Sequence, residues 1–301
     1  MNDLEQMENR AGIARVTCGW KKPALPLDVV RRYWRDVHSP AIARRAGVWD
    51  YRHYQFDPVD PQVFAPGVGI DSACAADAQL MWLSDVRYLD DAALTKFGTS
   101  PDGVVKSQLL ADIELIVERS TTYKAVGANA RTLLDRTGIA EPQGPVPRPQ
   151  YAVFFRQRDD EPAFRQCLQG LAERWARTPG VLRVRLSLFD APDMDAEKKA
   201  GYPVKTHAIE QQYQAWIDLV VEDATVARFL LTPQSGVDPA RDIRAIHAYP
   251  VRVVYTSVYA GSPTIVGLRG YPAWLAIREL DAANQREPAL LEWMYGPRVT
   301  E

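Results

Sequence analysis

An internal duplication limits the folds open to this chain more than any other property of its sequence. The segments AGVWDYRHYQFD, from Ala46, and PGVLRVRLSLFD, from Pro179, agree at one constant spacing. The matched pairs are Gly47 with Gly180, Val48 with Val181, Phe56 with Phe189 and Asp57 with Asp190. Before each segment, apolar residues recur every three to four positions, as they do on a helix with one buried face. A repeat of this size indicates one supersecondary unit used twice.

Each half carries the same predicted order of elements, β-α-β-β-α-β. The predicted strands are Ile13–Trp20, Trp49–Phe56, Gln79–Tyr88 and Ile113–Glu118 in the first half, and Tyr151–Arg156, the segment after Pro179, Tyr213–Val221 and Val251–Tyr255 in the second. This is the order of the ferredoxin-like unit, an antiparallel sheet with helices on one face. The bare apolar faces of two such sheets can cover each other. We therefore predict an α+β fold of two fused ferredoxin-like repeats that form an antiparallel dimeric-type α/β barrel around a cavity.

The boundary between the repeats is predicted at Glu141–Gln150, which reads EPQGPVPRPQ. Its prolines and glycine favour an extended, non-helical linker. We expect residues 1–140 to form the first repeat and residues 151–301 to form the second, together with a C-terminal helical extension. Two helices are predicted in that extension, Trp274–Asn284 and Glu287–Met294, and they could support a homodimer.

Composition excludes several classes of protein. The net charge is −2 over 301 residues, so no basic surface for nucleic acid is expected. No window approaches the roughly 18 apolar residues of a membrane span, and the first residues lack the apolar core of a signal peptide. The three cysteines, Cys18, Cys74 and Cys167, are widely spaced, which argues against disulfides and zinc ribbons. We expect a cytoplasmic protein with neither a nucleic-acid nor a membrane partner.

The first helical region carries a more specific pattern. Trp20–Pro40 reads WKKPALPLDVVRRYWRDVHSP, a strand end, a Lys-Pro turn and a helix that ends in a Tyr-Trp…His motif; Gly47-Val48 and Tyr51 follow. In these residues the first half resembles the EthD family. The second half is similar only to the wider dimeric α/β barrel superfamily, because Leu171 stands where the first half has His38.

The resemblance implies a function among several. It points to cofactor-free isomerases, dehydratases and cyclases that act on aromatic, lactone or polyketide compounds. Other members of the superfamily bind haem or assist a partner oxygenase. A fold does not choose among these activities, so the candidate residues must be weighed one by one.

Histidine is the side chain best suited to proton transfer near neutral pH. The chain has His38, His53, His207 and His247. His38 lies near the end of the predicted first helix, one turn after Trp34 on the same face, which suits a catalytic acid or base. The alternative is a histidine that hydrogen-bonds the last free carbonyls of that helix.

The strand Trp49–Phe56 places aromatic and polar side chains on one face. Period-two alternation puts Trp49, Tyr51, His53 and Gln55 together. An aromatic surface with a few polar groups is typical of a small-molecule site. The equivalent face of the second half carries leucine and valine, which favours a single site against the first sheet. The alternative is that this face packs on helices in both halves.

The remaining candidates are aromatic residues and one carboxylate. The predicted substrate-binding residues are Tyr33, Trp34, Trp49, Trp82, Glu114, Trp216 and Tyr213. Glu114 and Glu118 would share one face of the predicted fourth strand, where burial would raise the pKa of a carboxyl and make it a base. Mid-strand tryptophans can equally be core, and Glu114 can equally be solvated.

These residues predict a cofactor-independent lyase or isomerase acting on a hydrophobic aromatic or polyketide-like molecule. His38, His53 and Tyr51 are the predicted catalytic residues. His38 would move a proton, while the other two orient an oxygen or donate to a developing enolate. No cofactor and no metal are expected, because nucleotide-binding, HExxH and HxH patterns do not occur. The alternatives are a non-catalytic binding or accessory protein of a degradative or biosynthetic pathway, and a haem oxidoreductase with His247 as ligand.

Overall fold

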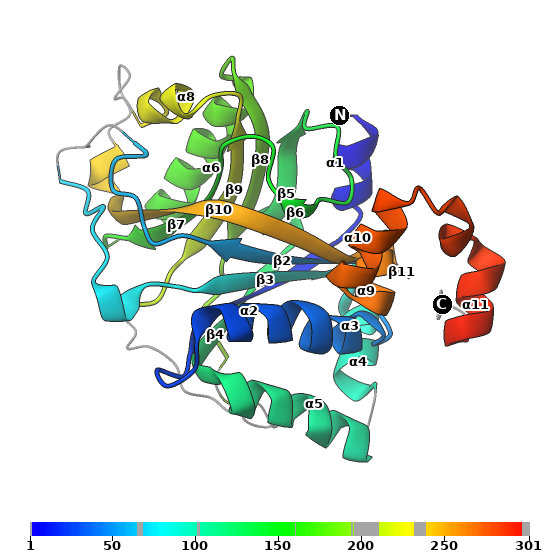
Figure 1. Cartoon of the computed structure of the whole chain (residues 1–301). Helices are drawn as coiled ribbons and strands as arrows, with labels where there is room; N and C mark the ends of the chain where they lie inside the picture. Colours follow the sequence, from blue (N-terminus) through cyan, green and yellow to red (C-terminus); the bar gives the residue numbers. More distant parts are fainter. Residues whose placement is uncertain are drawn as a thin grey trace.

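A computed structural model describes residues 2–64, 69–100, 103–159, 161–193, 195, 211–231 and 239–296. Two successive β-α-β-β-α-β units make up most of the chain (Figure 1). The first unit comprises β1 (Ile13–Lys21), α2 (Leu27–Tyr33), α3 (Ser39–Ala43), β2 (Asp50–Phe56), β3 (Trp82–Tyr88), α4 (Asp91–Thr99), α5 (Gly103–Ile116) and β4 (Val117–Val126). The second comprises β7 (Gln150–Gln157), α6 (Glu161–Arg177), β8 (Val181–Leu188), β9 (Ala215–Val221), α8 (Ala224–Phe229) and β10 (Ile243–Tyr259).

The strand order is the same in both units. It runs β4-β1-β3-β2 in the first and β10-β7-β9-β8 in the second, with every pairing antiparallel. The matched glycines Gly47 and Gly180 have positive φ angles of 86° and 82° at the turn from helix to second strand. Only glycine adopts this backbone without steric cost. The predicted fold of two fused ferredoxin-like repeats is confirmed.

The fourth strand of each repeat joins the two sheets. The first half of β10 pairs with β7 of its own repeat, and its second half pairs with β2 of the other repeat. Likewise, β4 pairs with β1, and β5 (Ala130–Asp135), which follows it almost at once, pairs with β8. The sheets therefore form a nearly closed barrel within one chain. Few backbone groups are left on open strand edges, which would otherwise attract other strands.

One predicted strand is wrong. Ile113–Glu118 spans the end of helix α5 and the start of β4. Leu109, Ile113 and Ile116 recur with helical spacing and form the face of α5 that is turned inward, whereas Glu114 is exposed. The short β-branched run at the helix end looks like a strand only when it is read without the residues before it. The predicted strand Val251–Tyr255 is part of the longer β10.

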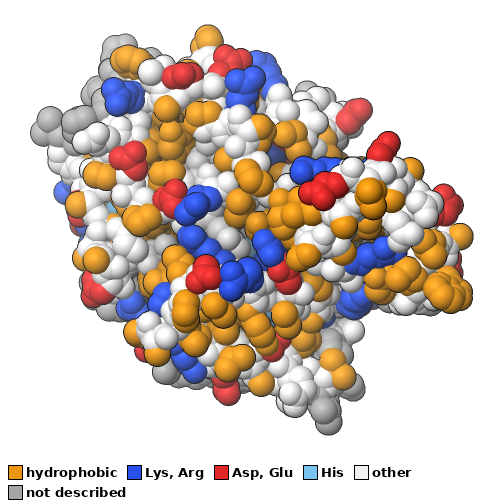
Figure 2. Space-filling view, in the orientation of Figure 1, with side chains coloured by type: hydrophobic (Ala, Val, Ile, Leu, Met, Phe, Trp, Pro, Cys, Tyr) orange, Lys and Arg blue, Asp and Glu red, His pale blue; other side chains and the backbone are white. Residues whose placement is uncertain are grey.

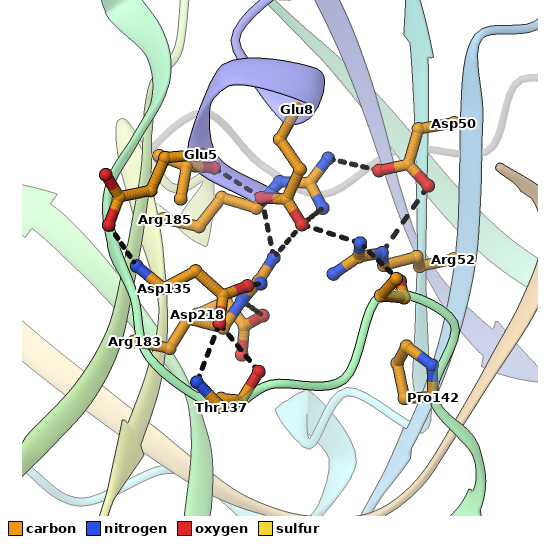
Figure 3. Close-up of polar contacts among 12 residues, drawn as sticks. Glu5, Glu8, Asp50, Arg52, Asp135, Thr137, Pro142, Arg183, Arg185 and Asp218 are labelled. Carbon is orange, nitrogen blue, oxygen red and sulfur yellow. Dashed lines mark hydrogen bonds and ion pairs between the residues drawn. The ribbon is translucent and has the colours of Figure 1, made fainter. Parts of the chain in front are cut away.

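The barrel interior is filled rather than hollow along most of its length. One part is an aromatic core that includes Tyr54, Phe154 and Trp216. The other part is a buried ionic network, most of which Figure 3 shows. Its charged members are Glu8, Asp50, Arg52, Asp85, Arg87, Asp135, Arg183, Arg185 and Asp218. Buried charges are stable only when they are paired in this way. Glu8 enters the network from α1 (Asp3–Glu8), the short helix that precedes β1.

The segment between the repeats and the C-terminal region add short strands and helices to the two repeats. The linker contains the short strand β6 (Gln143–Pro145), which pairs with β10. After β10 come the two-residue strand β11 (Ser262–Pro263), α9 (Ile265–Arg269), α10 (Tyr271–Glu279) and α11 (Pro288–Tyr295). Hydrophobic side chains gather over α11 at the edge of the molecule in Figure 2, where Trp293 is 82% exposed. Among the described residues, no helix has the length and apolar character needed to cross a bilayer.

Candidate functional site

Helix α2 continues into α3 through one wide turn that carries His38. Residues Trp34–His38 form a π turn, in which the backbone N–H of Ser39 donates to the carbonyl of Trp34. Pro40 lies in the following turn and has no N–H to continue a regular α-helical ladder, which is a common reason for such an irregularity. The turn holds the rings of Trp34 and His38 with centroids 4.4 Å apart. Single π turns of this kind occur frequently at functional sites.

A cavity of about 100 Å³ lies beside this turn, between the first sheet and helices α3 and α5; we call it the helix-face cavity. Figure 1 shows α2, α3 and α5 on the same side of that sheet. The wall of the helix-face cavity contains four of the predicted site residues, Trp34, His38, Tyr51 and Trp82. The strand face that carries Tyr51 and His53 therefore packs on the helices, which is the alternative that the sequence left open, and not against the second sheet.

His38 faces a carboxylate within this cavity wall. Its Nδ1 lies 3.6 Å from Oδ2 of Asp112 on α5, which is an ion-pair distance, and the His38 side chain is only 5% exposed. The hydroxyl of Tyr33 donates to the other oxygen, Oδ1, at 2.5 Å. His38 and the Tyr33 hydroxyl together hold the pKa of Asp112 below its ordinary value, while this hydrogen bond raises the pKa of Tyr33 to about 12. A carboxylate facing Nδ1 favours the tautomer that leaves the Nε2 lone pair free to accept a proton.

Tyr51 supplies a hydroxyl to the same cavity. It lies 2.9 Å from the hydroxyl of Ser39, and both side chains are buried. Burial raises the pKa of Tyr51, so its O–H remains protonated and able to donate. The indole N–H of Trp82, also in the wall, is buried without a hydrogen-bond partner among the described residues. Buried N–H groups are normally satisfied, and a polar atom of a bound molecule would satisfy this one.

His53 lies behind this wall and not in it. Its ring stacks on Trp34 with centroids 5.9 Å apart, its Nε2 is 3.3 Å from the amide of Gln55, and its Nδ1 is 3.5 Å from the hydroxyl of Ser84. Burial, reinforced by His38 and nearby arginines, lowers the pKa of His53 to about 3. His53 is a neutral side chain that contacts Trp34 and Ser84. It does not line the helix-face cavity, so the structure does not place it against a substrate held there.

The other predicted site residues lie elsewhere. Trp49 donates its indole N–H to the carbonyl of Met7 beside α1, and Glu114 points to solvent from α5. Trp216 is packed in the barrel interior. Tyr213 is also in the interior, where its hydroxyl lies 2.7 Å from Nδ1 of His247. His207 lies outside the described residues.

The second repeat has no equivalent of the helix-face cavity among its described residues. Leu168, Leu171 and Trp175 of α6 pack directly against Val184 and Leu186 of β8. Leu171, which stands in place of His38, is thus part of a filled core. Among the described residues, the helix-face cavity is therefore a feature of the first repeat alone.

Asp112 is the residue that the sequence analysis missed. Its neighbours Ile113–Glu118 read as a strand, so the helical face that carries Asp112 toward His38 went unrecognised. The signal was present in the spacing of Leu109, Ile113 and Ile116. Within the described part of the chain, no three His, Cys, Asp or Glu side chains come close enough together to hold a metal ion.

Comparison with known proteins finds only distant likenesses in structure. No protein-family model matches this chain, and no curated protein matches its sequence. A candidate monooxygenase from Fusobacterium nucleatum is similar in structure, with 12% identity, a TM-score of 0.45 and coverage of 83% of this chain and 96% of that chain. An anthrone oxidase-like protein has 9% identity and a TM-score of 0.46, with coverage of 82% of this chain and 93% of that chain. A haem complex of a Rhodococcus jostii DypB variant has 9% identity and a TM-score of 0.41, with coverage of 81% of this chain and 94% of that chain. Likenesses this distant say nothing of what this chain binds or does.

Proposed function

We propose that this chain is a cofactor-independent lyase or isomerase that moves a proton in a small, mostly apolar molecule held in the helix-face cavity. The observation that carries the proposal is the His38–Asp112 pair, in which a nearly buried imidazole in the wall of an aromatic cavity faces a carboxylate. Such a pair fixes the tautomer and orientation of the base, as in other nucleophile and base assemblies. The resemblance of Trp20–Pro40 to the EthD family supports the same class of reaction.

The chemistry needs only side chains of the chain itself. Nε2 of His38 takes a proton from an acidic C–H of the substrate, and the electron pair of that bond moves onto the substrate as an enolate. The Tyr51 hydroxyl donates a hydrogen bond to the enolate oxygen. In elimination the enolate expels the leaving group with the electron pair of its bond, and the leaving group takes the proton from Nε2 of His38. In isomerisation the enolate takes that proton back at another carbon. Either course returns His38 to its neutral form. Asp112 stabilises the imidazolium that exists between the two steps.

The cavity volume narrows the substrate class. A cavity of about 150 Å³ holds a benzene molecule, and the helix-face cavity is smaller, at about 100 Å³. We therefore propose that at most one ring, or a smaller unsaturated group, enters it, which favours single-ring aromatic or lactone compounds over multi-ring polyketides. Trp34 and Trp82 would contact the faces of such a group.

The proposal predicts exchange of substrate hydrogen with solvent. Single-ring ketones, lactones and phenols are incubated with the protein in deuterium oxide, and deuterium uptake is followed by mass spectrometry. General acid–base catalysis contributes about 10²–10⁴-fold, so His38→Gln should lower the exchange rate by that factor. Asp112→Asn should lower kcat with little change in KM, because it acts through His38. Glu114→Gln, an exposed carboxylate on the same helix, is the matched control and should exchange normally.

Three outcomes would contradict the proposal. Exchange that survives His38→Gln would remove the base from the mechanism. Binding without exchange, detected by quenching of tryptophan fluorescence, would favour the non-catalytic binding protein. Oxygen uptake that accompanies substrate loss would replace a lyase or isomerase with an oxidation, for which the same proton removal would be only the first step.

A further inference from the structure

A second cavity lies at one end of the barrel; we call it the barrel-mouth cavity. Its volume is about 500 Å³, within the range of about 300–1,000 Å³ typical of small-molecule sites. Arg52 and Tyr54 of β2 line it, whereas Tyr51 of the same strand lines the helix-face cavity. Because successive side chains point to opposite faces of a strand, the sheet separates the two cavities. The barrel-mouth cavity therefore does not depend on the proposed function.

Much of the wall is apolar and is built from segments far apart in the sequence. Val220 and Val254 come from barrel strands, Val146 comes from the linker, and Trp274 comes from α10. The linker with β6 forms one side, and it crosses in front of the barrel in Figure 1. This wall suits a ligand with a flat apolar body.

The floor is the edge of the ionic network, which Figure 3 shows next to the linker residues Thr137 and Pro142. Arg183 donates to Glu8, Asp135 and Asp218, so its guanidinium is fully paired. Arg52 donates from Nη2 to Glu8 and to the carbonyl of Ala140, and its Nε lies 3.4 Å from Oδ1 of Asp50. The floor is thus charged, rigid and already paired.

Two arginines lie at the rim of the cavity, and their guanidinium groups bind no described residue. The Arg136 and Arg148 side chains are exposed and line the cavity, and their guanidiniums make no contact with a described carboxylate. Two carboxylates share the wall: Glu141, whose pKa is raised by partial burial, and the exposed Glu222. Asp218 also lines the cavity, but Arg183, Tyr54 and Gln150 already bind it. The arginines are the groups left to bind a ligand.

We infer that the barrel-mouth cavity binds an organic anion with a flat apolar body, an aromatic ring system that carries a carboxylate or a sulfonate. The guanidinium groups of Arg136 and Arg148 present planar sets of N–H donors that match such an anion. The aromatic face of Trp274 and the valines receive the ring system. This ligand is larger than the helix-face cavity admits.

The probes are two dyes of similar shape and different charge. The sulfonate 8-anilinonaphthalene-1-sulfonate carries the anion, and N-phenyl-1-naphthylamine is its neutral counterpart. Each is titrated into the full-length protein, and energy transfer from tryptophan is recorded. In Arg136→Gln/Arg148→Gln the dissociation constant of the sulfonate should rise about tenfold, while that of the neutral dye stays the same. Arg228→Gln, an exposed arginine on α8 outside the cavity, is the control and should change neither.

Further variants locate the bound dye. Val146→Trp places a large ring in the cavity and should weaken the binding of both dyes, whereas His38→Gln at the other cavity should weaken the binding of neither. Added salt should weaken the binding of the sulfonate alone, because only the sulfonate makes an ionic contact. The inference is overturned if the arginine pair leaves sulfonate affinity unchanged, if Val146→Trp affects neither dye, or if neither dye binds saturably.

Discussion

The substitution Glu8→Gln isolates the contribution of one buried charge to this fold. The Glu8 side chain is 2% exposed and lies 2.6 Å from Nη2 of Arg52 and 3.0 Å from Nη2 of Arg183. It also accepts a hydrogen bond from the hydroxyl of Thr132 and lies 4.0 Å from Arg185. Glutamine keeps the size of the side chain and removes its charge. The arginines cannot gain water in exchange, because they are buried as well.

Breaking a buried ion pair from one side costs about 3–5 kcal/mol. The unfolding entropy is about 2.1 cal/mol/K per residue near 60 °C, or about 0.6 kcal/mol/K for 301 residues, so the melting temperature should fall by about 5–8 °C. Urea unfolding followed by circular dichroism measures the loss directly. Asp3→Asn removes an exposed carboxylate from the first turn of the same helix and should cost only about 0.3–1 kcal/mol.

The effect of Glu8→Gln should depend on pH. The arginines hold the pKa of Glu8 well below its ordinary value of 4.5 despite the opposing effect of burial. A carboxyl with a depressed pKa in the folded state stabilises the protein fully above its unfolded pKa, and this contribution is lost as the pH falls through the folded pKa. The difference between wild type and Glu8→Gln should therefore be constant above pH 4.5 and shrink in stronger acid. The reasoning is refuted if Glu8→Gln costs no more than Asp3→Asn at pH 7.

Two further predictions concern packing and titration. A Cβ added at Gly19 would lie 2.2 Å from the buried ring of Trp82, so Gly19→Ala should lower the free energy of unfolding by about 1–3 kcal/mol. Gly170→Ala on α6, where a Cβ meets nothing within 4 Å, should instead raise it by up to about 1 kcal/mol, and urea unfolding that gave equal values would contradict the packing argument. Burial lowers the pKa of His53 to about 3 and that of His247 to about 4, so neither imidazole signal should move in an NMR titration between pH 5 and pH 8. Because an unfolded histidine titrates near 6.5, both residues should make stability rise with pH from their folded values up to about 6.5, and a His53 midpoint near 6.5 would show that the ring is hydrated.

Patterns within a few neighbouring residues were enough to predict the architecture. The duplicated Gly-Val turn reflects a local backbone requirement, since Gly47 and Gly180 both adopt positive φ. Alternation along Trp49–Phe56 correctly groups Tyr51 with His53, because that period is a property of any extended chain. The helix that carries Trp34 and His38 was likewise visible from its spacing. Each of these features depends on bonds and contacts between residues close in the chain.

The alternation did not predict which side of the sheet Tyr51 and His53 face. It depends on which layer lies against each face, and the helices of the first repeat cover the face that carries Tyr51 and His53. The pairing of His38 with Asp112 was hidden for a similar reason. It joins α5 to the end of the first helix, and only packing brings these segments together.

The barrel interior is the clearest example of a property set by distant parts of the chain. Charged residues such as Glu8, Arg52 and Arg183 usually lie at the solvated surface. Arg52 has one partner nearby in the chain, Asp50, but the pairing of all three with one another joins distant segments. All three are buried because a helix from the N-terminus, a strand of the first repeat and a strand of the second meet at one point. Burying a charge is favourable only when an opposite charge arrives with it. Local periodicity therefore predicts the elements of this protein, and the meeting of the two repeats creates its ionic core and its barrel-mouth cavity.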